Sequence, residues 1–400
     1  LYLYDASTGV VKNQITSGNY LVRKVLHIDQ ENRVIYFEGS QNEGQGNPYF
    51  SYFYKVDFSG KNLKMLTPSI GDHTITISPN AKYFIDSYSQ VDLPPIHEVR
   101  DMNGKLVSTL EKTDISRLTA TGWKPPTPFT VKSAQGQWDL YGLLFTPKAM
   151  KLDEKLPVIV NIYPGPQGGS VGSWSFIASR GDNQALAELG FVVVQIEGSC
   201  NPNRSKSFHD ACYGNMGENT LPDQISGLKQ LQEKYEFLDL DNVGIWGHSG
   251  GGFATAAAMF KYPDFFKVGI SESGNHDNRN YEDDWGERYI GLETKDNNGV
   301  SNYEKQANQI FAKDLKGKLL LIHGGMDDNV PPYNSYLVVD ALIKANKDFD
   351  FILLPNARHG YGKDSYYIMR RRWDYFVQNL MHAVPPKEYV IKIAADPRNK

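Results

Sequence analysis

The 400-residue sequence lacks any long apolar run and any strong excess of charge. Its longest apolar stretches, such as residues 191–196, are strand-sized and fall short of the roughly 20 residues that a membrane helix needs. The formal net charge is -4, which offers no basic surface for nucleic acid. We therefore expect no membrane segment in this chain and no nucleic-acid partner.

Cysteine is scarce, and its two occurrences, Cys200 and Cys212, lie close together in one loop region. A disulfide between them and a pair of free thiols are both compatible with this spacing. A disulfide would imply an oxidising compartment. Neither cysteine has histidines near it in a zinc-binding spacing, so we expect no metal site.

The first 124 residues lack any amphipathic helix pattern. Short runs rich in Tyr, Val, Ile and Phe, as in residues 50–58, alternate with turn residues and predict an all-β region. A strand–turn–glycine–strand pattern ends at Gly9 and returns at Gly60 and Gly104, close to the roughly 40–50 residues of a propeller blade. The segment is long enough for about two to three such blades, whereas a closed propeller usually has four to eight. We predict part of a β-propeller, with an unrelated β-meander as the alternative.

The sequence also lacks an initiator Met and a signal peptide. Because Leu1 already lies in a strand-like run, we expect the native chain to begin earlier and any targeting region to precede this sequence.

Three prolines within residues 124–128 disfavour both helix and sheet and predict a linker. Beyond the linker, short apolar runs alternate with helical patterns, as expected for a doubly wound, mostly parallel sheet. The predicted buried strands cover residues 157–162, 191–196, 243–246, 268–271, 319–322 and 351–354. We therefore predict two domains, a partial propeller at 1–124 and an α/β domain at 125–400.

The segment G-H-S-G-G-G at residues 247–252 lies between an apolar run and a small-residue helix pattern. This is G-x-S-x-G in the strand–turn–helix context of a nucleophile elbow. The tight turn needs residues without bulky side chains, and the helix N-terminus favours negative charge that develops near Ser249. The segment predicts an α/β-hydrolase fold with Ser249 as the nucleophile.

A serine nucleophile needs a histidine base and an acid that orients it. In this fold the acid and then the histidine follow the serine along the chain. His359 follows the predicted strand at 351–354, so we predict that it is the base. The acid should follow the preceding strand, where Asp327 and Asp328 both fit and spacing alone does not choose between them.

Two hydrogen-bond donors should face the oxyanion of the tetrahedral intermediate. The N–H of Gly250 is one, because Gly250 directly follows the nucleophile. The loop after residues 157–162 should supply the other, but Pro164 and Pro166 have no N–H there. The phenol of Tyr163 is the candidate substitute, with a packing tyrosine as the alternative.

Other polar residues receive no catalytic role. His323 closes the strand before the acid loop and is interpreted as a hydrogen-bonded structural residue. The run Arg370, Arg371 and Arg372 on the last helix is interpreted as a solvated face.

These motifs resemble the prolyl oligopeptidase family of serine peptidases, and most closely its dipeptidyl peptidase IV branch. The resemblance is carried by Y-P-G-P at 163–166, the elbow at 247–252, E-R-Y-I-G at 287–291, H-G-x-x-D-D-N-V at 323–330 and H-G at 359–360. It implies a Ser249–Asp327–His359 triad and a side-chain oxyanion donor at Tyr163. It also implies that Asn329 holds a substrate carbonyl. The residues that it places around the side chain before the cleaved bond are Tyr281, Trp285, Tyr289 and Val330.

The implied activity is that of a serine peptidase that acts on peptides without a metal or cofactor. Through an acyl-enzyme intermediate it would release N-terminal dipeptides after proline or a small residue. The resemblance also implies a homodimer and, together with the cysteine pair, a periplasmic or secreted location. The alternatives are an acyl-peptide hydrolase or esterase with the same triad, and a catalytically silent propeller that binds partners.

Three features depart from the family's pattern. The usual Trp and Tyr beside the nucleophile are His248 and Gly250, and the second change opens one wall of the pocket. The usual D-G-R-G is E-G-S-C at 197–200, which removes an arginine. The paired glutamates that grip a substrate's free amino group belong to a propeller region outside this sequence.

Overall fold

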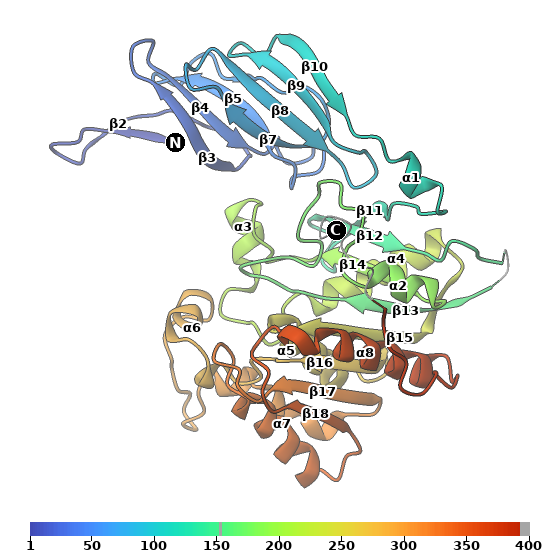
Figure 1. Ribbon diagram of the computed structural model, residues 1–400. Helices are drawn as coiled ribbons and strands as arrows, with labels where there is room; N and C mark the ends of the chain where they lie inside the picture. Colours follow the sequence, from blue (N-terminus) through green and yellow to red (C-terminus); the bar gives the residue numbers. More distant parts are fainter. Residues whose placement is uncertain (152–153, 393–400) are drawn as a thin grey trace. The chain divides into compact units, whose positions relative to one another are not determined.

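The computed structural model describes residues 1–151 and 154–392 (Figure 1). They form two compact units. The first contains Leu1–Pro128 together with Val171–Ala178 and Pro202–His209, and the second contains the other described residues. The two short segments come from the range predicted for the second domain; the boundary at residue 124 stays a prediction. None of the described helices is long and apolar enough to cross a membrane.

The first unit consists mainly of two four-stranded antiparallel sheets, blue to cyan in Figure 1. One sheet has the order β3-β4-β5-β6 and the other β10-β9-β8-β7, and β1 pairs with β2 in a separate hairpin. Their bounds are β1 Tyr2–Tyr4, β2 Val11–Gln14, β3 Val22–Asp29, β4 Val34–Gly39, β5 Tyr52–Asp57, β6 Lys64–Met65, β7 Asp72–Ile77, β8 Tyr83–Ser89, β9 Ile96–Asp101 and β10 Leu106–Lys112. A short helix, α1 (Ser116–Thr119), follows. Two successive antiparallel sheets match the blade content predicted from the repeat.

The repeat glycines have a common role in this unit. Gly9, Gly60 and Gly104 have φ angles of 71°, 81° and 83°, which side chains rarely adopt. Each N–H donates to the carbonyl of an aspartate three or four residues earlier, closing the turn between two strands. The sequence repeat therefore records a repeated turn geometry.

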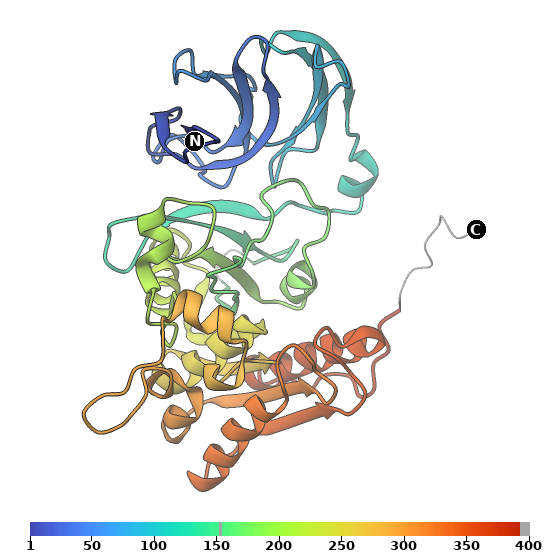
Figure 2. The ribbon, with the colours of Figure 1, turned by 90° about the vertical axis from the view of Figure 1, so that its left-hand side faces the viewer.

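The second unit is built on an eight-stranded sheet with the order β11-β12-β14-β13-β15-β16-β17-β18. β12 pairs with β14 in the antiparallel sense, and every pairing from β14 to β18 is parallel. The bounds are β11 Thr127–Lys132, β12 Asp139–Phe145, β13 Leu156–Asn161, β14 Val192–Glu197, β15 Leu238–His248, β16 Phe266–Glu272, β17 Lys318–Gly324 and β18 Asp350–Leu354. All six residues of β14 are buried, as expected for a strand covered on both faces. Figure 2 shows β17 and β18, in orange and red-orange, beside one another at one end of the sheet.

Helices follow the parallel strands along the chain. The helices of this unit are α2 Asn183–Glu188, α4 Leu221–Lys234, α5 Gly250–Lys261, α6 Asp283–Tyr289, α7 Tyr333–Lys344 and α8 Ser365–Leu380; α3 (Lys206–His209) belongs to the first unit. Helix α5 contacts β15 and β16, and α8 contacts the same two strands. Because parallel strands end at the same edge of a sheet, the loops after β13, β15, β17 and β18 meet there. These loops carry the predicted site residues.

Candidate active site

Ser249 occupies the sharp turn between β15 and α5. Its φ and ψ angles are 59° and -121°, a conformation that costs a non-glycine residue about 1–3 kcal/mol. The Ser249 N–H donates to the Glu272 carbonyl at 2.8 Å, and the Phe253 N–H donates to the Ser249 carbonyl at 3.0 Å. The strand β16 and the helix α5 therefore hold the serine in the strained geometry expected of a nucleophile elbow.

Three glycines of the elbow are required by close backbone contacts. A Cβ on Gly247 would lie 2.4 Å from the Ile162 carbonyl oxygen, and one on Gly251 would lie 2.3 Å from the same atom. A Cβ on Gly252 would lie 2.3 Å from the Glu272 carbonyl oxygen. Gly250 differs, because the nearest atom to its Cβ would be Cζ of Tyr163, at an ordinary 3.7 Å. A side chain at residue 250 would therefore face the Tyr163 ring without a clash.

The loops after β17 and β18 bring Asp327 and His359 together. Oδ2 of Asp327 lies 2.7 Å from Nδ1 of His359, and the Asp327 side chain is fully buried. The N–H groups of Asn329 and Val330 donate to Oδ1 at 3.1 and 2.9 Å. Burial raises the pKa of Asp327, but hydrogen bonds from His323, His359 and Val330 outweigh it, so its pKa lies well below the ordinary value. A carboxylate that stays charged keeps the proton on Nδ1 of His359 and leaves Nε2 free to act as a base.

The structure separates the two aspartates between which the spacing did not choose. The Asp328 carboxylate is exposed and pairs with the exposed guanidinium of Arg358. His323 bonds Ser335 Oγ through Nδ1 at 2.7 Å and the Val330 carbonyl through Nε2 at 2.9 Å, as expected of a structural residue. Its Nε2 also lies 3.3 Å from Oδ2 of Asp327, so His323 contributes to stabilising the buried carboxylate.

Tyr163 lies beside the elbow, two residues after the end of β13. Burial raises the pKa of its phenol, and the hydrogen-bonded side chains of Gln167 and Ser249 oppose that increase. Its backbone N–H donates to Ser170 Oγ at 2.9 Å, and that hydroxyl donates back to the Tyr163 carbonyl at 3.2 Å. A Cβ on Gly250 would lie 3.8 Å from the phenol oxygen, so the phenol and the N–H of Gly250 are two neighbouring candidate donors beside Ser249.

The predicted pocket aromatics form a continuous group. The ring centroids of Tyr281 and Trp285 are 5.7 Å apart, and those of Trp285 and Tyr289 are 5.3 Å apart. Burial raises the pKa of Tyr281, and Tyr163 and Asp327 are among the nearby groups that raise it further. We call Tyr281, Trp285 and Tyr289 the aromatic box. The other two predicted binding residues lie beside Asp327: Val330 is buried and Asn329 is exposed.

Arg372 is buried, which makes the interpretation of Arg370–Arg372 as a solvated face wrong for this residue. Its guanidinium donates to Glu272 and Asp182 and stacks 3.6 Å from the centroid of the Trp246 ring. A run of charged residues indicates a solvent-exposed face only when no oppositely charged group from a distant segment pairs with one of them. The helical periodicity of the sequence could have predicted this burial. Arg372 lies four residues from Ile368 and from Phe376, so all three share one helix face, and all three are buried.

Glu272 extends this buried network to the serine loop. Burial raises its pKa, but Arg372 and His248 lower it more, so the net shift is downward. Nδ1 of His248 lies 3.8 Å from Oε2 of Glu272, and the His248 ring lies 4.6 Å from that of His359. His248, noted in the sequence only as a departure from a family pattern, therefore joins a buried carboxylate to the predicted base.

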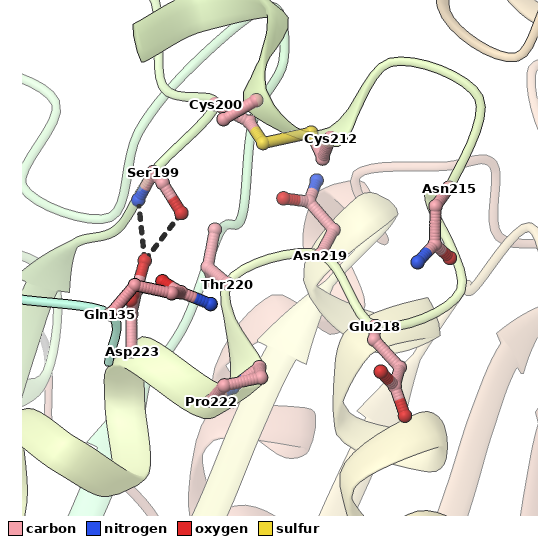
Figure 3. A pocket seen from close by; sticks show the side chains of 11 residues that line it. Gln135, Ser199, Cys200, Cys212, Asn215, Glu218, Asn219, Thr220, Pro222 and Asp223 are labelled. Carbon is pink, nitrogen blue, oxygen red and sulfur yellow. Dashed lines mark hydrogen bonds between the residues drawn. A yellow bond between two sulfur atoms is a disulfide. The ribbon is translucent and has the colours of Figure 1, made fainter. Parts of the chain in front are cut away.

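Cys200 and Cys212 form a disulfide, the first of the two alternatives that their spacing left open. Figure 3 shows this bond at the edge of a polar cavity of about 170 Å³, where Ser199 donates to Asp223 through its N–H at 2.8 Å and its hydroxyl at 2.5 Å. On another side the disulfide packs with Met216, Ile290 and Tyr303, and Trp285 and Tyr289 rest against that cluster. The disulfide therefore lies behind two residues of the aromatic box. The part of the chain that the structure describes holds no group of three or more His, Cys, Asp or Glu residues that could bind a metal.

Comparison with known families gives two matches that together cover most of the chain. The model of the "Prolyl oligopeptidase family" matches residues 176–383. The model of the "Dipeptidyl peptidase IV (DPP IV) N-terminal region" matches residues 1–95. The order of the two matches agrees with the fold class predicted from the sequence, a partial propeller followed by an α/β-hydrolase domain, and confirms it.

Individual relatives agree with the family matches. Human dipeptidyl peptidase 8 is 30% identical over 86% of this chain and 39% of its own length. Mouse prolyl endopeptidase FAP is 26% identical over 90% of this chain and 47% of its own length. The crystal structure of Porphyromonas gingivalis dipeptidyl peptidase 4 superposes with a TM-score of 0.82 at 26% identity, covering 95% of this chain and 52% of that one. A putative dipeptidyl aminopeptidase IV from Bacteroides ovatus gives 0.81 at 29% identity, covering 93% and 52%. The chain thus spans about half the length of these proteins or less.

Proposed function

This chain belongs to the prolyl oligopeptidase family, and we propose that it is a serine peptidase that releases dipeptides from the N-terminus of peptides, after proline or a small residue. The observation that carries the proposal is the 2.7 Å contact between Asp327 and His359 at the strand edge that also holds Ser249. A buried carboxylate, a histidine oriented by it and a serine in an elbow are the parts of an acyl-transfer site.

The proposed reaction proceeds in two steps. Nε2 of His359 takes the Ser249 hydroxyl proton as Oγ attacks the peptide carbonyl, and the proton then passes to the leaving amine. The N–H of Gly250 and the phenol of Tyr163 donate to the oxyanion. Water, deprotonated by His359, next attacks the acyl-enzyme, and the proton returns to Ser249 as the dipeptide leaves. Asp327 holds the imidazole in the required tautomer throughout.

The aromatic box supports the choice of substrate. Its rings provide an apolar surface suited to a proline ring or a small apolar side chain. We assign it to the residue before the cleaved bond, with Val330 as a neighbouring wall and Asn329 as a donor to the substrate backbone. The names of the relatives, dipeptidyl peptidases from animals and bacteria, support the same class of substrate.

A second candidate function is an acyl-peptide hydrolase or esterase that uses the same triad. The observation that favours it is the open position at Gly250, where a side chain would fit against Tyr163 and none is present. A wider pocket accepts larger acyl groups and discriminates less between proline and other residues.

The deciding experiment compares kcat/KM of the full-length protein on a matched pair of dipeptide amides, Gly-Pro and Gly-Phe, with the Ser249→Ala variant as the blank. Strong preference for Gly-Pro supports the proposal. Weak or reversed preference with turnover that depends on Ser249 selects the second candidate. Absence of both turnover and Ser249-dependent labelling by a fluorophosphonate would overturn both.

Location and assembly are separate proposals. The Cys200–Cys212 disulfide supports a periplasmic or secreted location, since such bonds persist in oxidising compartments. We also propose a homodimer, on family likeness alone; light scattering of the full-length protein tests it.

A further inference from the structure

Gln167 joins the aromatic box to the phenol of Tyr163 through two hydrogen bonds. The indole Nε1 of Trp285 donates to Oε1 of Gln167 at 3.1 Å. Nε2 of the same amide donates to the phenol oxygen of Tyr163 at 2.9 Å. Gln167 thus connects a residue of the proposed substrate pocket to a residue of the proposed oxyanion hole.

Chemistry fixes the direction of both bonds. An indole N–H can only donate, so the oxygen of the amide must face Trp285. The amide NH₂ group then faces Tyr163 and can only donate, so the phenol oxygen acts as an acceptor. The phenol hydrogen is therefore left for another acceptor, and Ser249 is the other side chain that influences the pKa of the phenol. The same direction serves an oxyanion that forms on the substrate next to Ser249.

The Gln167 side chain contributes little to the fold of its loop. Gln167 is exposed, whereas the loop is tied down at Ser170. The Ser170 hydroxyl bridges the N–H and carbonyl of Tyr163, and the Ser170 N–H donates to Glu197 at 2.9 Å. The Gln195 side chain donates to the Ser170 carbonyl as well. Loss of the Gln167 amide should leave this backbone in place and change the direction of the Tyr163 O–H.

We propose that Gln167 is a positioning residue that aims the Tyr163 hydroxyl at the oxyanion and links that aim to the state of Trp285. This inference rests on the proposed function, in which Tyr163 is an oxyanion donor. Donation into the phenol oxygen also polarises the O–H bond, which strengthens its donation to a developing negative charge. A substrate side chain that packs against Trp285 would hold the indole in place. The hydrogen-bonded amide of Gln167 and the phenol of Tyr163 would then be held in place as well.

The test compares Gln167→Met, which keeps the shape and removes both bonds, with Gln167→Glu, which keeps the shape and reverses one bond. A carboxylate accepts from Trp285 and also accepts the Tyr163 proton, which would then point away from the oxyanion. We expect Gln167→Met to lower kcat on the order of tenfold with KM changed less, and Gln167→Glu to lower kcat further. The thermal midpoints of both variants should stay near that of the wild type.

A double-mutant cycle with Tyr163→Phe separates this inference from the function on which it rests. We expect Tyr163→Phe to lower kcat on the order of 10²–10³-fold. In that background Gln167→Met and Gln167→Glu should have no further effect on kcat, because the hydroxyl that they orient is gone. Additive effects, or a Gln167→Glu variant as fast as wild type, would overturn the role of Gln167 while Ser249-dependent hydrolysis continued to support the proposed function.

The rate of Ser249 labelling by a fluorophosphonate gives the same comparison without a peptide substrate, because negative charge develops on the phosphoryl oxygen in the oxyanion hole. The order wild type, Gln167→Met, Gln167→Glu from fastest to slowest is expected. Equal labelling rates in all three would overturn the inference even if the peptide substrate proves to be of another class.

Discussion

Arg372 in α8 donates to a single carboxylate oxygen, Oε1 of Glu272, from two nitrogens at 3.0 and 2.7 Å. Its third nitrogen, Nη1, donates to Asp182 at 2.6 Å. Glu272 ends β16, and its backbone carbonyl also receives the N–H of Ser249. A buried ion pair therefore links the last helix to β16, whose last residue accepts the N–H of the nucleophile.

Replacing Arg372 with methionine should destabilise the second unit. The change keeps much of the side-chain volume but leaves the carboxylates of Glu272 and Asp182 buried without a cation. We expect the free energy of unfolding to fall by about 3–5 kcal/mol, measured by urea unfolding followed by tryptophan fluorescence. Arg371→Met is the matched control, since Arg371 is partly exposed and should change stability by less than about 1 kcal/mol. Equal losses in the two variants would contradict a special role for the buried pair.

The two aspartates after β17 provide a direct test of the acid. Asp327→Asn keeps the side-chain shape but favours the wrong tautomer of His359, so we expect kcat to fall about 10³–10⁴-fold. Asp328→Asn changes only an exposed carboxylate paired with Arg358 and should leave kcat within a few-fold of wild type. Steady-state kinetics on a dipeptide amide measure both; a larger loss in the Asp328 variant would refute the assignment of Asp327.

The depressed pKa of Asp327 predicts a dependence of stability on pH. Because the folded state binds the proton less readily than the unfolded chain, this carboxylate stabilises the fold above the ordinary aspartate pKa of about 3.9. That contribution is lost progressively as the pH falls below about 5 toward the folded-state pKa. Urea midpoints measured at several pH values from 6 to 3 should therefore decline less steeply in Asp327→Asn than in wild type. Asp328→Asn should keep the wild-type slope, and parallel curves for all three would contradict the expectation.

Adjacent glycines in the elbow should respond to alanine in opposite directions. Gly250 does not have a positive φ and has space for a Cβ, so Gly250→Ala should stabilise the unit by about 0.4–1 kcal/mol through a less flexible unfolded chain. Gly251→Ala places a methyl group 2.3 Å from the Ile162 carbonyl oxygen and should cost about 1–3 kcal/mol. Thermal unfolding of the two variants measures this difference. Equal stabilities would show that the backbone of the elbow shifts to accommodate a methyl group at Gly251, which would contradict the prediction.

The disulfide should matter for both stability and substrate binding. Cys200 and Cys212 are 12 residues apart, and replacing both with serine should lower the free energy of unfolding by about 2–4 kcal/mol. Because Trp285 and Tyr289 rest against the disulfide cluster, we expect KM for a dipeptide amide to rise by a larger factor than kcat falls. Dithiothreitol on the wild-type protein should reproduce the effect and leave the serine variant unchanged. An unchanged KM in the double-serine variant would show that the disulfide does not affect the substrate pocket.

The sequence by itself determined the features that short segments encode. Buried parallel strands appear as continuous apolar runs, and the elbow appears as glycines around Ser249 between a strand and a helix. The repeat around Gly9, Gly60 and Gly104 appears because each turn needs a positive φ. Ser249, Asp327 and His359 each follow a predicted strand, and because parallel strands end at one edge of their sheet, the sequence predicts that these residues lie at that edge.

Only the tertiary structure decided which partner each polar residue would find. Cys200 was equally compatible with a thiol and a disulfide, and the spacing of Asp327 and Asp328 favoured neither. The sequence predicted that Arg372 is a surface charge, whereas in the structure it is buried and pairs with Asp182 and Glu272, 190 and 100 residues earlier. Gln167 carried no pattern at all, because its role depends on Trp285, 118 residues away. Hydrophobic periodicity records which face of an element is buried, but hydrogen bonds and ion pairs depend on angles and distances that arise only when distant segments pack together.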